Sequence, residues 1–201
     1  MLERLDLNEV AEAYFSVRTP DRPEYERLLI RAGAEAIFPL LDALLIVTSE
    51  YKNQIVTLIR RERLSTKEAD AVRIFLAKAY MEPMIEAAYD VVRRIGPLAQ
   101  VLLCGMLLHY EYKIRIAAAV LLTMNNSPDE KVQKLVPLSI ALLQQKYRNQ
   151  GILVRVLGIV LFHTEASEWK KIVEDEARSK DVTVDEWMKQ IMNTALAELV
   201  R

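Results

Sequence analysis

Three residues carry side chains suited to nucleophilic or metal chemistry, namely Cys104, His109 and His163. A thiol beside an imidazole can form a nucleophile–base pair, and thiolates and imidazoles are common zinc ligands. Cys104 is, however, the single cysteine, and the two histidines are far apart in the chain. We therefore expect Cys104 to be a small core residue, and each histidine to bond free carbonyl groups in a last helical turn. A catalytic pair of Cys104 and His109 is the alternative that the spacing leaves open.

Other side chains that take part in catalysis or phosphate binding are present without the pattern that such a site needs. The five glycines never cluster, as they would in a phosphate-binding loop. Glu82 and Glu86 are one helical turn apart, but this spacing is typical of a solvated helix face. The basic runs at 60–63 and 93–94 fall where helices are expected to end, and cations there complement the helix dipole. The sequence therefore predicts no catalytic residue, no cofactor and no metal.

Composition and charge indicate the class of protein. Helix formers such as Leu, Ala, Glu and Arg dominate, and no stretch alternates as several strands would, so we expect an all-α fold. The 27 basic and 28 acidic side chains nearly cancel, which disfavours a protein whose main task is to coat phosphate backbones. We see no signal peptide, and no apolar run reaches the ~20 residues of a membrane span. A lone cysteine suits a reducing compartment, so we expect a cytoplasmic protein with no membrane partner.

Helix starts and stops can be read along most of the chain. Asn8 is expected to cap a first helix, and a second is expected over about 23–32. A third helix through 37–45 should be followed by a separate one that begins at Thr48 or Ser49. Further starts are predicted by capping boxes at Ser65, Ser127 and Thr183 and by Gly96 followed by Pro97. The whole chain is predicted to form about 11–12 helices, and its short loops favour antiparallel hairpins.

Two stretches of the sequence repeat each other. Residues 37–45 and 135–143 share Pro, Leu, Ala, Leu and Leu at identical spacing. A second match follows each copy, because Tyr51-Lys52-Asn53-Gln54 resembles Tyr147-Arg148-Asn149-Gln150. Glu111-Tyr112-Lys113 is a third echo of the same pattern. Matched segments in the same order on consecutive predicted helices indicate internal repeats.

One segment resembles a HEAT repeat. Gly96-Pro97-Leu98 leads into an apolar helix, and Ile114-Arg115-Ile116 leads into a second helix rich in alanine. Residues 33–61 and 135–163 resemble weaker copies of this unit. The chain is therefore similar to the HEAT/armadillo proteins. This resemblance implies a right-handed α-α superhelix, a HEAT-like solenoid of about five or six antiparallel hairpins.

The resemblance also implies how the chain is organised. All residues, 1–201, are expected to form a single HEAT-like domain. It would consist of a divergent N-terminal hairpin (1–32), HEAT-like repeats (33–163) and C-terminal capping helices (164–201) anchored by Trp169 and Trp187.

The repeated Tyr-Lys and Tyr-Arg pairs are the candidate binding residues. We expect each pair near the start of the second helix of a repeat, and in the implied superhelix second helices form the concave face. Equivalent positions of successive repeats line up along such a face. The predicted partner-binding ridge consists of Tyr51, Lys52, Asn53, Tyr112, Lys113, Arg115, Tyr147, Arg148, Asn149 and Arg155. The alternative is that the tyrosines pack between repeats and the cations are solvated at the turns.

The leading hypothesis for function is a non-catalytic scaffold or adaptor that binds a protein or peptide on its concave face. Because fold does not dictate function, two alternatives stay open. Nucleic-acid binding, as in HEAT-like DNA-repair glycosylases with a concave basic face, is disfavoured by the neutral net charge. The other alternative is a regulatory or lyase-like subunit that holds a small ligand. The sequence leaves open whether the chain forms a homo-oligomer.

Overall fold

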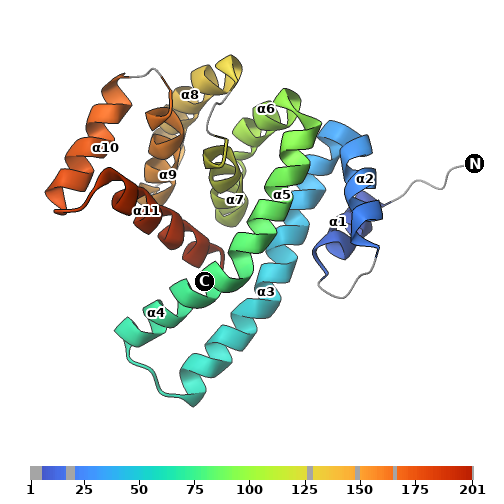
Figure 1. Cartoon of the computed structure of the whole chain (residues 1–201), viewed down its shortest axis with the longest axis horizontal. Coiled ribbons are helices and arrows are strands. Elements are labelled where there is room, and N and C mark those ends of the chain that lie inside the picture. The colour runs from blue at the N-terminus through green and yellow to red at the C-terminus, as the bar shows by residue number, and fades with distance from the viewer. Residues whose placement is uncertain (1–5, 17–20, 126–128, 148–149, 165–166, 201) are drawn as a thin grey trace, which may run out of the picture.

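A computed structural model describes residues 6–16, 21–125, 129–147, 150–164 and 167–200, and these residues form helices and no β-strand. The all-α prediction is confirmed. In chain order the elements are α1 (Leu7–Phe15), α2 (Arg22–Ala32), the 3-10 segment η1 (Gly33–Ala36), α3 (Ile37–Arg61), α4 (Thr66–Leu76), the π-helical segment η2 (Ala77–Met81), α5 (Glu82–Ile95), α6 (Pro97–Met106), α7 (Tyr112–Thr123), α8 (Glu130–Lys146), α9 (Gly151–Phe162), α10 (Ser167–Ser179) and α11 (Val184–Leu199) (Figure 1).

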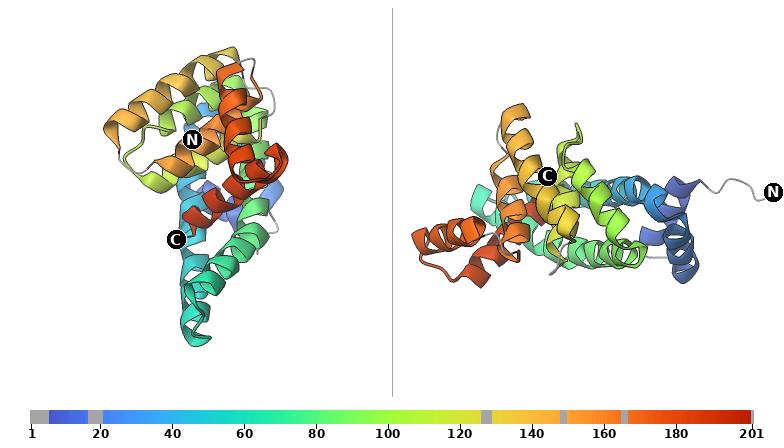
Figure 2. Two further views of the ribbon diagram at one scale, coloured as in Figure 1. Left: turned by 90° about the vertical axis from the view of Figure 1, so that its left-hand side faces the viewer. Right: turned by 90° about the horizontal axis from the view of Figure 1, so that it is seen from above.

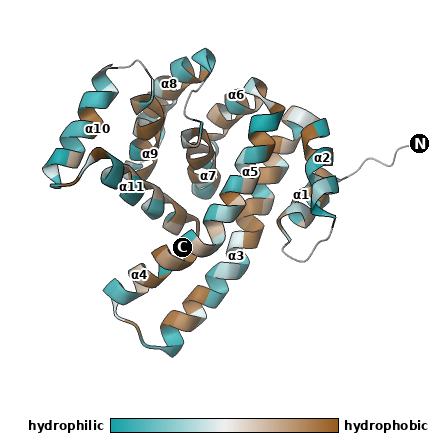
Figure 3. Ribbon diagram, in the orientation of Figure 1, coloured by the Kyte–Doolittle hydropathy of each residue, from teal (hydrophilic) through white to brown (hydrophobic). Residues whose placement is uncertain are grey.

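Helices α7 and α9 form the centre of the later half of the molecule. Every residue of α7 from Ile114 to Thr123 is buried, and α9 is apolar over most of its surface (Figure 3). A helix without a polar face has to be covered on several sides. Accordingly α7 packs against α6, α9 and α11, while α9 packs against α7, α8, α10 and α11. The pairs α6–α7, α8–α9 and α10–α11 are thus built around two buried second helices.

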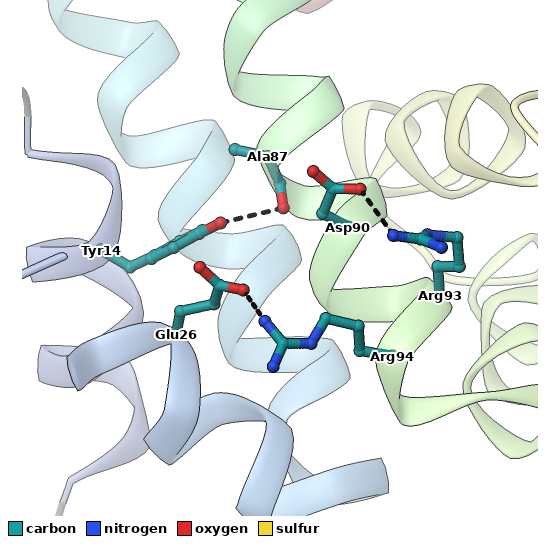
Figure 4. A network of polar contacts seen from close by, with 6 residues as sticks. All are labelled: Tyr14, Glu26, Ala87, Asp90, Arg93 and Arg94. Carbon is teal, nitrogen blue, oxygen red and sulfur yellow. Dashed lines mark hydrogen bonds and ion pairs between the residues drawn. The ribbon is translucent and has the colours of Figure 1, made fainter. Parts of the chain in front are cut away.

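The first two helices pack on the long helices α3 and α5 (Figure 1). The hydroxyl of Tyr14 in α1 donates a hydrogen bond to the carbonyl oxygen of Ala87 in α5, 3.0 Å away. In addition, Glu26 of α2 forms an ion pair with Arg94 of α5, as Figure 4 shows. These contacts join residues far apart in the sequence and fix the N-terminal pair of helices to the rest of the molecule.

Helix α3 is continuous, so the prediction of a new helix at Thr48 or Ser49 is wrong. Both hydroxyls instead donate to carbonyl oxygens one turn earlier, Thr48 to Leu45 and Ser49 to Ile46, each at 2.7 Å. A hydroxyl bonded back to its own helix does not cap a new one. Residues 33–61 therefore form one long helix after a short 3-10 segment, and not the hairpin expected of a repeat. The second half of α3 and helix α4 project from the body of the molecule (Figures 1 and 2).

Several predicted helix ends are confirmed. Ser65 and Thr183 both form complete capping boxes. Gly33 and Gly96 end helices with φ values of 62° and 93°, in the region that favours glycine. The predicted cap of the first helix is wrong, because the side chain of Asp6, and not that of Asn8, accepts the capping hydrogen bond.

The start of α8 also differs from the prediction. The carboxylate of Asp129 accepts a hydrogen bond of 2.8 Å from the backbone N–H of Lys131, so Asp129 is the N-cap and the helix begins at Glu130. Ser127, the predicted cap, lies outside the described residues.

The two tryptophans of the C-terminal helices pack inward, as predicted for them. Trp187 of α11 is 1% exposed. Trp169 of α10 lies against Gly158 of α9, where an added Cβ would be 3.4 Å from the indole ring. Helix α11 also packs against η2 and α4, from the first half of the chain, whereas a simple open stack of hairpins has contacts only between neighbours. Among the described helices, none is both long and apolar enough to cross a lipid bilayer.

Candidate binding groove

The first members of the predicted ridge lie on α3 and at the start of α7, two helices that pack against each other. Tyr51 and Lys52 occupy the middle of α3, not the start of a helix, and the ring of Tyr51 stacks on that of Tyr80 at 4.8 Å. The ammonium of Lys113 donates a hydrogen bond of 2.8 Å to the carbonyl oxygen of Leu199 at the end of α11. Burial and, to a smaller degree, the like charge of Lys52 lower the pKa of Lys113. Lys113 thus supports the last helix.

A second group surrounds Arg115, which is only 3% exposed. Its guanidinium donates to the carbonyl oxygens of His109 and Tyr110 at 2.6 and 2.9 Å. The same group lies over the ring of Tyr147 at 4.1 Å and that of Tyr112 at 5.4 Å. Arg115 is therefore enclosed by the turn between α6 and α7 and by two tyrosine rings, and it holds that turn in place.

The other predicted ridge residues lie apart from these groups. Arg155 of α9 forms an ion pair of 3.1 Å with Glu176 of α10. Asn53 is exposed on α3, while Arg148 and Asn149 lie outside the described residues. The described members of the ridge thus fall into separate groups. In two of these groups, those of Lys113 and Arg115, the cation makes hydrogen bonds within the protein. Whether they bind a partner stays a prediction.

The thiol and the imidazoles are also placed by the structure. Cys104 is 3% exposed, and burial raises the pKa of its thiol to about 12, so its prediction as a core residue is confirmed. His109 follows α6, and its Nδ1 accepts a hydrogen bond of 3.2 Å from the backbone N–H of Glu111. Its ring therefore accepts a hydrogen bond within the turn, whereas we expected it to bond a free carbonyl. His163 is the C-cap of α9 and is exposed. In the described part of the chain, no three His, Cys, Asp or Glu side chains are placed to hold a metal ion.

A hollow with a mainly apolar lining lies between α5, α7 and α11 and has a volume of about 380 Å³. Its apolar floor comes from Ile85, Val120, Met124, Met188, Met192 and Leu196. Its polar rim consists of Lys78, Glu82, Glu86, Lys189 and Asn193. We call these eleven residues together the methionine groove. Three further hollows, at α1–α3, α8–α10 and α10–α11, have walls about as polar as they are apolar.

The helix period places these side chains side by side. Met188, Met192 and Leu196 follow one another at intervals of four residues and so share one face of α11, which starts at a fixed capping box. Val120 and Met124 are related in the same way on α7. The hydroxyl of Thr123 in α7 lies 3.5 Å from the sulfur of Met192, which brings the two faces together. The floor is thus made of two helix faces in contact, with Ile85 of α5 as its third side.

The rim on the α5 side starts in η2, where the helix widens to a π-helical turn. Lys78 belongs to this turn, and Glu82 and Glu86 follow one and two turns later. π-helical turns within longer helices are frequent at functional sites. All four charged rim side chains are exposed, and none forms an ion pair within the described residues. The groove therefore combines a flexible apolar floor with charged rim side chains for which the described part of the chain shows no ion pair.

Sequence reasoning missed the groove. Its local signal in the sequence is the row Met188, Met192 and Leu196, which falls within the predicted capping helices (164–201). Comparison of the chain with protein-family models, with curated proteins and with solved structures finds no match, so its function has to be inferred from the molecule itself.

Proposed function

We propose that this protein is a non-catalytic, cytoplasmic scaffold of the HEAT-like α-solenoid kind, and that it binds a segment of a partner protein in the methionine groove. The observation that carries the proposal is an apolar hollow, lined by three methionines and ringed by charged side chains that form no ion pair within the described residues. Methionine side chains are flexible and polarizable, and they are common on surfaces that adapt to a bound segment. An apolar centre with a polar rim is also the usual layout of a protein interface.

The position of the groove supports the same function. Helices α7 and α11 are the second members of the pairs α6–α7 and α10–α11, and both contact α9, the second helix of the pair between them. Two sides of the groove, α7 and α11, are therefore second helices from pairs that are not consecutive along the chain, and the third side is α5. In HEAT-like superhelices second helices form the concave face, where the sequence predicted partner binding.

A capture experiment tests the proposal. The double variant M188Q/M192Q keeps the length of both side chains but makes the floor polar, so we expect recovery of the partner from host extract to fall at least tenfold. The matched control is L98Q/L138Q, which removes two exposed leucines from α6 and α8, outside the groove. Thermal melting of both variants checks that the fold persists.

Two results would count against the proposal. Undiminished recovery with M188Q/M192Q would show that the partner binds elsewhere. A small molecule that co-purifies with the intact chain in native mass spectrometry, and is lost from M188Q/M192Q, would favour a subunit that holds a ligand.

A further inference from the structure

The charges on the rim of the methionine groove are sorted by side. The α5 side carries Glu82 and Glu86, two exposed carboxylates one helical turn apart, with Lys78 one turn before them. The α11 side carries Lys189 and the uncharged Asn193. Lys189 is near enough to Glu186 to help lower the pKa of that carboxyl, but it forms no ion pair in the described structure. The α5 side therefore has a net charge of −1, with its two carboxylates adjacent and Lys78 one turn before them, whereas the α11 side has a net charge of +1.

The walls also restrict the conformation of a bound segment. The described residues contain no β-strand whose edge could pair with an extended peptide. An extended segment in this groove would leave its backbone hydrogen-bonding groups without partners as water is expelled. A helix satisfies these groups itself and presents apolar side chains every three or four residues.

The length of the floor matches such a helix. Met188 and Leu196 are eight residues apart on α11, which corresponds to about 12 Å along the helix axis. Two or three apolar side chains at i, i+4 and i+7 on a bound helix span a similar distance. The hollow of about 380 Å³ is near the lower end of the range of about 300–1,000 Å³ for ligand pockets, which suits a few side chains better than a folded domain.

We infer that the methionine groove binds an amphipathic helix whose apolar stripe is bordered on one edge by two basic residues one turn apart. The basic residues pair with Glu82 and Glu86 while the stripe covers the floor. This inference rests on the proposed function and adds the chemistry of the partner. Charges at the rim of an interface govern selectivity and association rate more than affinity, so the stripe supplies most of the binding and the edge selects among helices.

The test uses the whole 1–201 chain and synthetic helical peptides with one shared leucine stripe. One edge of the peptide carries two Lys, two Glu or two Gln at i, i+4, and a further Lys-edged peptide has serine in place of the leucines. Fluorescence anisotropy gives each Kd at low and high salt. We expect the Lys-edged peptide to bind about tenfold more tightly than the Glu-edged one, with the difference shrinking at high salt. The serine peptide should not bind.

Variants assign this preference to the rim. E82Q/E86Q should make the Kd of the Lys-edged peptide equal to that of the Glu-edged one and leave the Kd of the Gln-edged peptide unchanged. E168Q/E174Q removes the same charge from α10 and should change nothing, and K189Q should keep the advantage. Shifts in the methyl resonances of Met188 and Met192 locate the bound peptide.

The outcomes separate the inference from the proposed function. Equal affinity for the three edges would overturn the charge selection, although a groove-dependent protein partner would still stand. If no leucine-striped peptide binds while M188Q/M192Q still loses its captured partner, the helical form of the ligand is wrong. If neither peptide nor partner depends on the groove, both proposals fail.

Discussion

A thiol enclosed by apolar side chains resists ionisation, and Cys104 is placed in this way. Because its folded-state pKa is about 12 against an ordinary 9.0, the thiol favours the folded state below pH 9, and this contribution is lost as the pH rises from 9 towards 12. We expect the free energy of unfolding to fall over this range and the Cys104→Ala variant to show a flatter profile between pH 9 and 10. Urea denaturation at closely spaced pH values measures the free energy of unfolding of both proteins over this range.

A second group is a useful control at higher pH. Burial raises the pKa of the Tyr14 phenol above 10.0, so its stabilising contribution is lost only above pH 10, and Tyr14→Phe should alter the profile there but not below.

A thiol-specific reagent should also react with Cys104 at pH 8 only after denaturation. Rapid modification of the native protein would contradict the enclosed position of the thiol.

Individual residues were predictable where their role depends on local sequence. Cys104 lies in an apolar run, which was enough to assign it to the core. Arg115 was predicted to lie on a binding surface, because the sequence shows its charge. It does not show that the carbonyl oxygens of His109 and Tyr110 accept hydrogen bonds from its guanidinium. These partners become apparent only in the three-dimensional structure of the turn between α6 and α7.

Two helix ends have the same hydrogen-bond pattern but different residues in the left-handed position. After α3 this position is Arg63, with φ 50°, and after α10 it is Asp181, with φ 55°. At each end the next N–H reaches back to the carbonyl five residues earlier, at 3.2 Å in both cases. The two ends therefore form a matched pair.

The cost of the left-handed conformation, about 1–2 kcal/mol for most residues, exceeds the entropic cost of glycine, about 0.5–1 kcal/mol. We therefore expect Arg63→Gly to raise the free energy of unfolding by up to about 1 kcal/mol. Asp181→Gly should raise it less, because aspartate tolerates this conformation better. Chemical denaturation of both variants measures the two free energies of unfolding. A lower stability of Arg63→Gly would show that the Arg63 side chain makes a contact whose loss costs more than the relief of the left-handed conformation gains.

Whole elements were predictable where their ends are encoded locally. The capping boxes at Ser65 and Thr183 and the glycines at 33 and 96 fixed four boundaries, since each depends on residues within one turn. The break predicted at Thr48 failed because a hydroxyl can either cap a new helix or bond back to its own, and sequence alone does not decide between the two.

At the scale of the whole molecule, helix α11 closes the structure by packing on α7, α9, α4 and η2. Lys113 contributes to this closure through its bond to Leu199. We expect Lys113→Met to lower the free energy of unfolding by about 1–2 kcal/mol, as for a partly exposed hydrogen bond from a charged group. Hydrogen exchange should show the largest loss of protection in α11.

The neighbouring lysine is the matched control. Lys52→Met removes a like charge beside Lys113 and leaves the bond to Leu199 in place, so stability should stay the same or rise slightly. Equal destabilisation by both variants would mean that the bond to Leu199 is not what holds α11.

The groove could not be predicted from the sequence because its parts are distant along the chain. Ile85, Val120 and Met192 come from three helices, and only the docking of α11 brings them together. The spacing of Met188, Met192 and Leu196 places them on one face of α11, but it does not show which helices that face meets. The repeat pattern indicated neighbouring hairpins, whereas the groove depends on a contact beyond the nearest neighbour.

The same distant contact has a consequence for biosynthesis. Chains fold from the N-terminus as they leave the ribosome, and contacts between remote segments form late. The earlier helix pairs can assemble while translation continues, but the side of the groove formed by α11 exists only after that helix has emerged. A nascent chain that has not yet exposed α11 would therefore lack the groove and could not engage its partner there.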